Sequence, residues 1–315
     1  MKKVLLAAGL MGLMGTTAMA EMQIGVSVAR FDDNGLTVMR NGMTAFDEAN
    51  DDVALQVEDA TDDVAKQLDQ INNFIASGVD AIIVNPVDTS ATQAMTQAAE
   101  AAGVPLVYVN RQPINVDTLP DNQAFVASNE IESGTLETFE ICKILRSQGL
   151  GGGARAYLMM GELSNQAAVQ RTKDVDDILG TDMCNFIEII DRQTANWSRE
   201  QATSLMTNWL SSGEEFNAVI ANNDEMAIGA IQAMKAAGLD MDVIVVGGVD
   251  ATQDALSAMQ AGDLDVTVFQ NAAGQGSGAL DAALALARGE EVDQKVYIPF
   301  ELVTPANIDD YLSAN

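Results

Sequence analysis

The stretch NAVIANNDEMAIGAIQAMKAAG, from Asn217 to Gly238, decides the fold. It opens with a short apolar run at 218–221 and continues through the polar residues 222–224. Apolar residues then return at helical spacing over 227–234, and a glycine commonly follows the last turn of a helix. The stretch therefore predicts a buried strand, a polar corner at its carboxyl end, and a helix.

The same pattern recurs along the chain. Strands are predicted at 23–29, 53–58, 80–84, 104–109, 124–127, 154–160, 186–190, 217–221, 243–248, 265–269 and 296–303. Helices are predicted near 35–49, 62–77, 89–102, 130–147, 165–179, 199–211, 251–261 and 272–287. Such alternation favours right-handed βαβ units and parallel sheets. Because so many strands exceed one sheet of ordinary size, the sequence predicts an α/β protein with two doubly wound lobes.

The first residues have the features of an export signal. Residues 1–20 contain Lys2 and Lys3, an apolar run, and a final A-x-A pattern ending at Ala20. The alternative is a membrane anchor, which the shortness of the apolar run disfavours. We expect the signal peptide to be removed and the mature chain to begin at Glu21.

Composition excludes several classes of function. The net charge of −30 would repel nucleic acid and anionic lipid. The chain has no histidine, which removes Ser-His and Cys-His nucleophile pairs and histidine zinc sites. Export permits a disulfide between Cys142 and Cys184, and two buried free thiols remain the alternative.

Polar residues gather where the predicted strands end, which is where doubly wound sheets bind ligands. The set combines carboxylates, amides, two arginines and a tryptophan. These groups suit a neutral polyhydroxyl ligand, because each hydroxyl both donates and accepts while an aromatic face covers the C–H side of a ring. The residues at these corners are Asp32, Asp33, Asn34, Asn85, Asp88, Asn110, Arg111, Glu162, Arg171, Asn196, Trp197, Asn222, Asn223, Asp224, Asp250, Gln270 and Asn271.

Each corner residue also has a structural alternative. Asp33 could be only a helix N-cap, and Trp197 could belong to the core. Arg111 and Arg171 could be exposed ion-pair partners, and Asp224 a cap or a support for its neighbours. A metal cage at 32–34 is disfavoured, since the glycine turn and terminal glutamate of a calcium loop are missing.

Several longer segments resemble one known family. They are IGVSVARFDDN at 24–34, GVDAIIVNPVD at 78–88, GVPLVYVNRQP at 103–113, VIANNDEMAIGAIQAMKAAG at 219–238 and VGGVDATQDALSAMQAGDLDVTVFQ at 246–270. The chain resembles the bacterial periplasmic sugar-binding proteins of the ribose- and galactose-binding type. Within that group it looks most similar to inositol- and rhizopine-binding members, through VNRQPINVDTLPDNQAFVASNE at 109–130 and MMGELSNQAAVQRTKD at 159–174.

The resemblance implies a type I periplasmic binding protein with two lobes joined by three hinge crossings. The crossings are expected near 128–129, 270–271 and 297–299. The N-terminal lobe would comprise 21–128 plus 271–297, and the C-terminal lobe 129–270 plus 298–315. Both cysteines would then lie in the C-terminal lobe, on helices flanking one strand, which favours the disulfide.

The resemblance also implies a ligand set and some departures from it. Gly35 stands where relatives place a ring-stacking aromatic, and Phe31 is the candidate to replace that wall. Asn165, a further candidate ligand residue, and Ala167 stand where galactose-binding members have a histidine and an aspartate, which argues against galactose. The calcium loop of those members has no counterpart around 143–155. The positions that match ligand contacts of the family are Asp33, Asn110, Arg111, Arg171, Trp197, Asn223, Asp250 and Gln270.

These features predict a monomeric periplasmic substrate-binding subunit of an ABC importer, with no enzymatic activity, cofactor or metal. The expected ligand is myo-inositol or a close relative, and the expected partner is a permease in the inner membrane. A pentose or hexose ligand is the first alternative, and presentation of the ligand to a chemoreceptor or sensor kinase is another. A carbohydrate enzyme is disfavoured, because its paired carboxylates are already assigned to binding. A repressor effector domain would need an N-terminal DNA-binding helix pair in place of the signal peptide.

Overall fold

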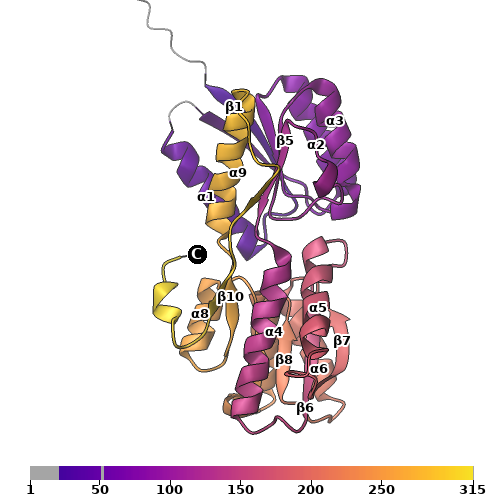
Figure 1. The fold of residues 1–315 in the computed structure, drawn as a ribbon, viewed down its shortest axis with the longest axis vertical. Helices are drawn as coiled ribbons and strands as arrows, with labels where there is room; N and C mark the ends of the chain where they lie inside the picture. Colours follow the sequence, from indigo (N-terminus) through magenta and orange to yellow (C-terminus); the bar gives the residue numbers. More distant parts are fainter. Residues whose placement is uncertain (1–20, 51–52, 315) are drawn as a thin grey trace, which may run out of the picture.

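A computed structural model describes residues 21–50 and 53–314. The predicted signal peptide at 1–20 lies outside the described residues. The chain forms two lobes along the long axis of the molecule (Figure 1). Among the helices that the structure describes, none is long and apolar enough to cross a membrane.

The elements follow the predicted alternation, with boundaries that differ by a few residues. The strands are β1 (Met22–Val28), β2 (Val53–Asp59), β3 (Ala81–Val84), β4 (Leu106–Val109), β5 (Gln123–Ala127), β6 (Ala154–Met160), β7 (Ile187–Thr194), β8 (Ala218–Ala221), β9 (Val245–Gly247), β10 (Thr267–Phe269), β11 (Lys295–Tyr297) and β12 (Glu301–Val303). The helices are α1 (Asn34–Glu48), α2 (Val64–Ser77), α3 (Thr92–Ala102), α4 (Glu130–Ser147), α5 (Gln166–Leu179), α6 (Arg199–Leu210), α7 (Asp224–Ala236), α8 (Gln253–Gln260) and α9 (Ala272–Ala287). Short 3-10 turns lie at Thr89–Ala91, Val116–Thr118, Met241–Val243 and Ile308–Asp310.

Each lobe has a parallel sheet covered by helices on both faces. The first sheet has the strand order β11-β5-β4-β3-β1-β2, with α1 and α9 on one face and α2 and α3 on the other. The second has the order β7-β6-β8-β9, with α6, α7 and α8 on one face and α4 and α5 on the other. The predicted α/β class with two doubly wound lobes is confirmed.

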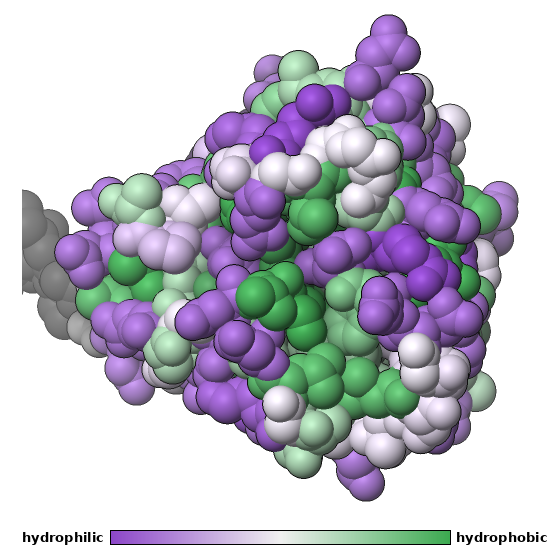
Figure 2. Space-filling view, turned by 90° about the horizontal axis from the view of Figure 1, so that it is seen from below, coloured by the Kyte–Doolittle hydropathy of each residue, from purple (hydrophilic) through white to green (hydrophobic). Residues whose placement is uncertain are grey.

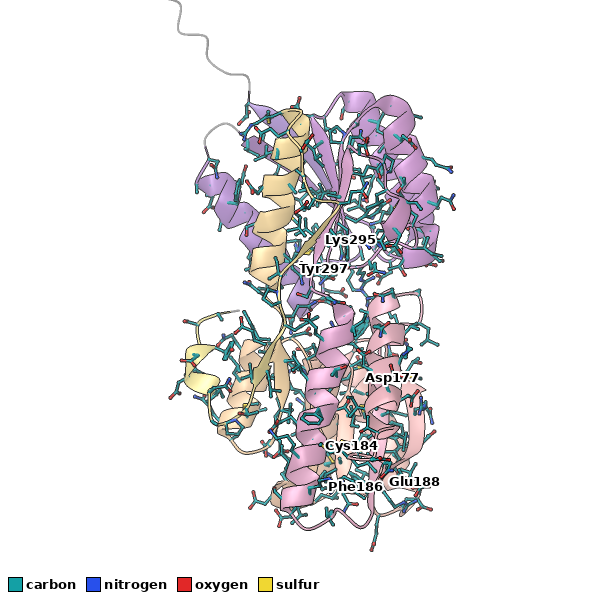
Figure 3. All side chains as sticks on the ribbon, viewed as in Figure 1. Asp177, Cys184, Phe186, Glu188, Lys295 and Tyr297 are labelled. Atoms are coloured by element: carbon teal, nitrogen blue, oxygen red, sulfur yellow. A yellow bond between two sulfur atoms is a disulfide. The ribbon has the colours of Figure 1, made fainter. Side chains whose placement is uncertain are left out.

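The prediction of one strand over 296–303 was wrong. This segment holds two strands that belong to different sheets: β11 pairs with β5 in parallel, whereas β12 pairs antiparallel with β10. Pro299 lies between them and has no N–H to continue a ladder. The break is one of the places where the chain passes between the lobes, and Figure 3 labels Lys295 and Tyr297 on the strand that leads to it. Within the described residues the other passages follow β5 and β10.

Close approach of two helices fixes the outer layer of the first lobe. A Cβ at Gly276 of α9 would lie 2.1 Å from the carbonyl oxygen of Met39 on α1. Any other residue there would force α9 away from α1, so glycine is required at this contact. Because α9 begins directly after a passage between the lobes, its packing against α1 also fixes the position at which the chain enters the first lobe.

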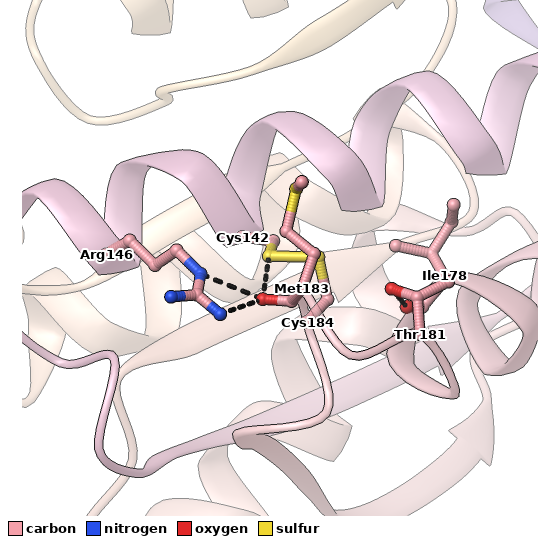
Figure 4. Close-up of a disulfide and its surroundings, with 6 residues drawn as sticks. All are labelled: Cys142, Arg146, Ile178, Thr181, Met183 and Cys184. Atoms are coloured by element: carbon pink, nitrogen blue, oxygen red, sulfur yellow. Dashed lines mark hydrogen bonds between the residues drawn. A yellow bond between two sulfur atoms is a disulfide. The ribbon is translucent and has the colours of Figure 1, made fainter.

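The two cysteines form a disulfide, with Cα atoms 5.7 Å apart (Figure 4). Cys142 lies on α4 as expected, but the expectation that Cys184 also lies on a helix was wrong. Cys184 lies in the turn between α5 and β7. The same turn is held by Arg146, whose Nε donates to the carbonyl oxygen of Met183 at 2.8 Å.

The surface reflects the acidic composition. Figure 2 views the molecule from the end occupied by the second lobe, and hydrophilic side chains cover much of this face, with hydrophobic ones in smaller groups between them. Most carboxylates are spread over many segments of the chain, which is typical of charges on a solvent-exposed surface. The carboxylates that are buried therefore need a separate explanation.

Candidate functional site

One cavity between the lobes collects the predicted ligand residues. It encloses about 480 Å³ of space not filled by atoms, part of it continuous with solvent. The eight residues that match the family's ligand contacts all line it, and so does Asn165. The full lining is Asp33, Gly35, Leu36, Asn110, Arg111, Glu130, Asn165, Ala167, Arg171, Trp197, Asn223, Asp250, Gln270 and Ala272.

Three lining residues cap helices and also face the cavity. Oδ1 of Asp33 accepts from Leu36 N at 2.8 Å, and Asn165 and Asn223 cap α5 and α7 in the same way. Asp33 is therefore the N-cap of α1, as its structural alternative proposed, and it also lines the cavity. A cap uses one oxygen of the carboxylate, which leaves Oδ2 for a ligand hydroxyl.

Arg111 enters the cavity from the first lobe as a buried cation. Its side chain is 3% exposed, and Nη1 donates to the carbonyl oxygens of Pro86 and Val87 at 3.1 and 3.2 Å. Burial lowers the pKa of the Arg111 guanidinium, against the opposing effect of Glu162 and Asp33. These contacts exclude the exposed ion pair that the sequence left as an alternative. They fix the direction in which the guanidinium can donate.

Arg171 is held from the second lobe by a carboxylate that the sequence reasoning missed. Its Nε and Nη2 donate to the two oxygens of Glu130 at 2.7 and 3.1 Å, and Nη1 donates to the carbonyl oxygen of Asn222 at 2.7 Å. The guanidinium lies 5.7 Å from the Trp197 ring centroid. Glu130 opens α4 directly after a passage between the lobes, where the sequence predicted only a hinge crossing near 128–129 and the start of a helix.

Asp250 is a second carboxylate of the same lobe that lies beside Arg171 at the cavity wall. Its Oδ1 lies 3.9 Å from Nη1 of Arg171. Burial raises the pKa of Asp250 well above its ordinary value, although Arg171 opposes the shift. The backbone of Asp250 has φ +124°, a conformation that side chains other than glycine rarely adopt. Strain and burial at one carboxylate are typical of a functional position.

Asp224 supports this corner from below. Its Oδ2 accepts from Thr252 N at 2.9 Å and its Oδ1 accepts from the hydroxyl of Thr267 at 2.7 Å. Burial raises the pKa of Asp224 to about 7. Asp224 is fully buried and does not line the cavity, which agrees with the prediction that it supports its neighbours.

Asn110 connects the cavity to the passages between the lobes. Its Nδ2 donates to Oε1 of Gln275 at 3.0 Å, and its Oδ1 accepts from Asn85 at 3.3 Å. Gln275, on the first turn of α9, also donates to the hydroxyl of Ser128 at 2.9 Å. The side chain of Asn110 is therefore positioned by groups that lie beside two of the passages.

Trp197 packs flat against a glycine. It belongs both to the core of the second lobe and to the cavity wall, and it follows Asn196 with φ +51° and +63° at the two residues. A Cβ at Gly161 would lie 2.2 Å from the indole ring. The glycine thus provides the space in which the ring lies.

Replacing Gly161 by alanine is expected to weaken ligand binding by about tenfold. The added methyl group cannot fit beside the ring at 2.2 Å, so the indole must move toward the cavity, and such overpacking costs roughly 1–3 kcal/mol. Titration of myo-inositol followed by tryptophan fluorescence measures the loss. Gly152→Ala is the control, because a Cβ there meets nothing within 4 Å. Equal affinity of both variants would contradict this role for Gly161.

Phe31 does not replace the missing aromatic wall. Its ring packs under the guanidinium of Arg40, at 4.0 Å from the ring centroid. It lines a separate surface hollow with Asp32 and Asp59, so the expectation for Phe31 does not match its position. At the wall where Gly35 stands, the structure instead brings Leu36 to the cavity. In the part of the chain that the structure describes, no group of three or more His, Cys, Asp or Glu side chains is arranged to hold a metal ion.

Comparison with known proteins identifies the class to which this fold and cavity belong. A model of the periplasmic binding protein domain matches residues 24–291. A protein of Rhizobium meliloti named "Putative rhizopine-binding protein" is 61% identical over 315 residues, which is 100% of each chain. The chain belongs to the periplasmic binding protein family.

Two solved structures extend this result. An ABC transporter solute-binding protein from Bacillus halodurans, with bound myo-inositol, is 40% identical and has a TM-score of 0.87, covering 95% of this chain and 100% of that one. A Caulobacter myo-inositol binding protein, bound to myo-inositol, is 26% identical with a TM-score of 0.82, covering 95% and 98%. The type I periplasmic binding protein fold predicted from the sequence is confirmed.

Proposed function

We propose that this protein is the substrate-binding subunit of an ABC importer and captures a small cyclic polyol, with myo-inositol as the first candidate. One observation carries the proposal: two buried arginines, the carboxylates of Asp33 and Asp250, amides and a tryptophan line one cavity between two lobes. Ligand hydroxyls can donate to the carboxylates and accept from the guanidinium groups. The two inositol-bound relatives support the choice of ligand.

Each lining group has an assigned role in this proposal. Asp33 and Asp250 accept hydrogen bonds from ligand hydroxyls, and Arg111 and Arg171 donate to them. Asn110, Asn165, Asn223 and Gln270 select among stereoisomers, since amides can donate or accept. Trp197 covers one face of the ring. Because Arg171 is already paired with Glu130, it does not require a charged ligand.

The ligand would be captured by closure of the two lobes. We assign 21–128 plus 271–297 to the N-terminal lobe and 129–270 plus 298–315 to the C-terminal lobe. Asp33, Asn110 and Arg111 then contact the ligand from one lobe and Arg171, Asn223 and Asp250 from the other. A ligand held by both sides favours the closed form by its differential affinity for it.

The cellular setting follows from the family and from the predicted signal peptide. We propose that the mature chain acts in the periplasm as a monomer, that its closed form docks on a permease of the inner membrane, and that it catalyses no reaction. Presentation of the bound ligand to a chemoreceptor or sensor kinase is compatible with the same site.

Thermal unfolding of the mature, dialysed protein tests the ligand. The panel is myo-inositol, scyllo-inositol, ribose, galactose, glucose and xylose. A ligand at a hundred times its dissociation constant stabilises the native state by about 2.7 kcal/mol, and we expect such a shift with myo-inositol. A shift with an aldose alone would replace the inositol assignment by the pentose or hexose alternative. No shift with any of the six would contradict the polyol assignment.

A further inference from the structure

Glu162 lies between two arginines of the opposite lobe. It belongs to the loop after β6 in the second lobe, whereas Arg30 and Arg111 follow β1 and β4 in the first. Nη2 of Arg30 donates to Oε1 of Glu162, and Nη2 of Arg111 lies 3.9 Å from Oε2. Arg30 is held in turn within its own lobe by Asp62, at 3.0 Å. One carboxylate thus joins the lobes through two cations.

The environment makes this pair stronger than an ordinary surface ion pair. The side chains of Arg30 and Glu162 are each 18% exposed and that of Arg111 is 3% exposed, so solvent screens them less than it screens a fully exposed pair. Arg111 is fixed by two backbone carbonyls, which carry no net charge. Among the described carboxylates, Glu162 is the one that forms an ion pair with Arg111.

A neutral ligand cannot supply the missing charge. Arg111 is almost completely shielded from water in this structure, and a polyol offers it hydrogen bonds but no counter-ion. A buried charge without a partner is costly. Glu162 arrives from the other lobe with the closure itself, so it neutralises Arg111 only in the closed form.

Building on the proposed function, we propose that Glu162 is a positioning residue that fastens the lobes together. It holds Arg111 in its ligand-binding direction from the opposite lobe, and both arginines must release it before the ligand can leave. Glu162 touches the mouth of the cleft and does not line the ligand cavity. It would therefore set the residence time of the ligand without contacting it.

Other contacts between the lobes lack this connection to the ligand cavity. Thr89 donates through N and Oγ1 to the carbonyl oxygen of Ser164 at 3.0 and 3.1 Å. Asn34 donates to Oε1 of Glu225 at 2.8 Å. These are hydrogen bonds from neutral donors, and their donors do not line the cavity. Glu162 differs because one of its two partners is a lining cation.

The test is the dissociation rate of myo-inositol from Glu162→Gln, followed by stopped-flow tryptophan fluorescence. Glutamine keeps the shape and removes the charge, so the closed form loses stability while the solvated open form does not. Loss of one member of a buried charge pair acts mainly on dissociation. We expect dissociation to accelerate about tenfold and association to change by less than about twofold, because association begins from open lobes.

The matched control is Glu200→Gln. Glu200 lines the same mouth from the same lobe and is exposed, and it forms none of the ion pairs found among the described residues. The Glu200→Gln substitution removes the same charge as Glu162→Gln does, so a general effect of net charge would appear in both variants. Rising salt should accelerate dissociation from the wild type and have little effect on Glu162→Gln. Equal dissociation rates for wild type and Glu162→Gln would overturn the proposal.

A second readout separates this proposal from the choice of ligand. Failure of myo-inositol to bind the wild type would contradict the proposed ligand but would leave Glu162 testable by the distance between the lobes. Spin labels at the exposed positions 73 and 232, on α2 and α7, report that distance in the dialysed protein. Glu162→Gln should shift the distribution toward longer distances than Glu200→Gln. Identical distributions would overturn the role of Glu162 in closure.

Discussion

The Asp250→Ala variant is expected to lose binding of myo-inositol by a factor of at least about a hundred. Hydrogen bonds to a charged group contribute roughly 1.5–3 kcal/mol each, and the Asp250 carboxylate can accept from two neighbouring hydroxyls. Its removal also leaves Arg171 without the carboxylate that faces it at 3.9 Å. Isothermal titration calorimetry at pH 7 measures the loss.

The fold of this variant should remain intact. Burial raises the pKa of Asp250, which means that the folded protein holds this carboxylate in an environment that disfavours its charge. The alanine removes that cost and leaves the strained backbone as it is. The ligand-free variant should therefore unfold at the same temperature as the wild type or slightly above it. Loss of binding without loss of stability is the result that identifies a ligand contact.

Asp242→Ala provides the control for charge. Asp242 is an exposed carboxylate of the same lobe, so its removal changes the net charge by the same amount. Affinity should be unchanged in this variant. An Asp250→Ala protein that binds myo-inositol as tightly as Asp242→Ala does would contradict the assignment of Asp250 to the ligand.

The site was predictable to a large extent because of sheet geometry. In a parallel sheet all carboxyl ends lie at one edge, so residues far apart in sequence, such as Asp33 and Asn110, converge once the strands are recognised. The two lobes then bring a second edge to the first. The structure gathers the eight ligand candidates on one cavity, although their contacts with a ligand remain predictions.

The failures arose where local sequence does not determine the neighbour. Glu130 was missed because its importance depends on Arg171, 41 residues away. Phe31 has the right chemistry for a ring wall, but its ring packs against Arg40, nine residues along the chain. The segment 296–303 has a strand composition throughout, and only the tertiary structure shows that its two halves belong to different sheets. Secondary-structure propensity describes which local conformation a residue prefers. Which distant side chain or strand it contacts depends on the whole fold.

The Glu137→Gln variant is expected to be more stable than the wild type at alkaline pH and equally stable near pH 5. Glu137 is fully buried on α4. Its Oε1 accepts from Ala221 N at 3.2 Å, and its Oε2 has no hydrogen-bond partner among the described residues. Burial, against the hydrogen bond from Ala221, raises the pKa of Glu137 from 4.5 to about 8.

The direction of the effect follows from proton binding. Between pH 4.5 and 8 the folded protein keeps the proton of Glu137 while the unfolded chain has lost it, so the wild type loses stability as pH rises. The loss is roughly 1.4 kcal/mol per pH unit, with an upper limit of about 5 kcal/mol. Glutamine has the same shape and no proton to lose. The stability difference between the two proteins should therefore grow with pH and level off above about pH 8.

Denaturant unfolding at pH 5, 6, 7, 8 and 9 measures this difference, with Glu140→Gln as the control. Glu140 lies on the same helix and pairs with Lys143 at the surface, so its removal should change stability by a small amount that varies little over this range. A constant difference between Glu137→Gln and wild type would show that Glu137 is ionised in the folded protein. Asp224 and Asp250, whose pKa values burial also raises, are present in both proteins. A rising difference would show that a neutral, buried Glu137 on α4 is one source of the alkaline instability.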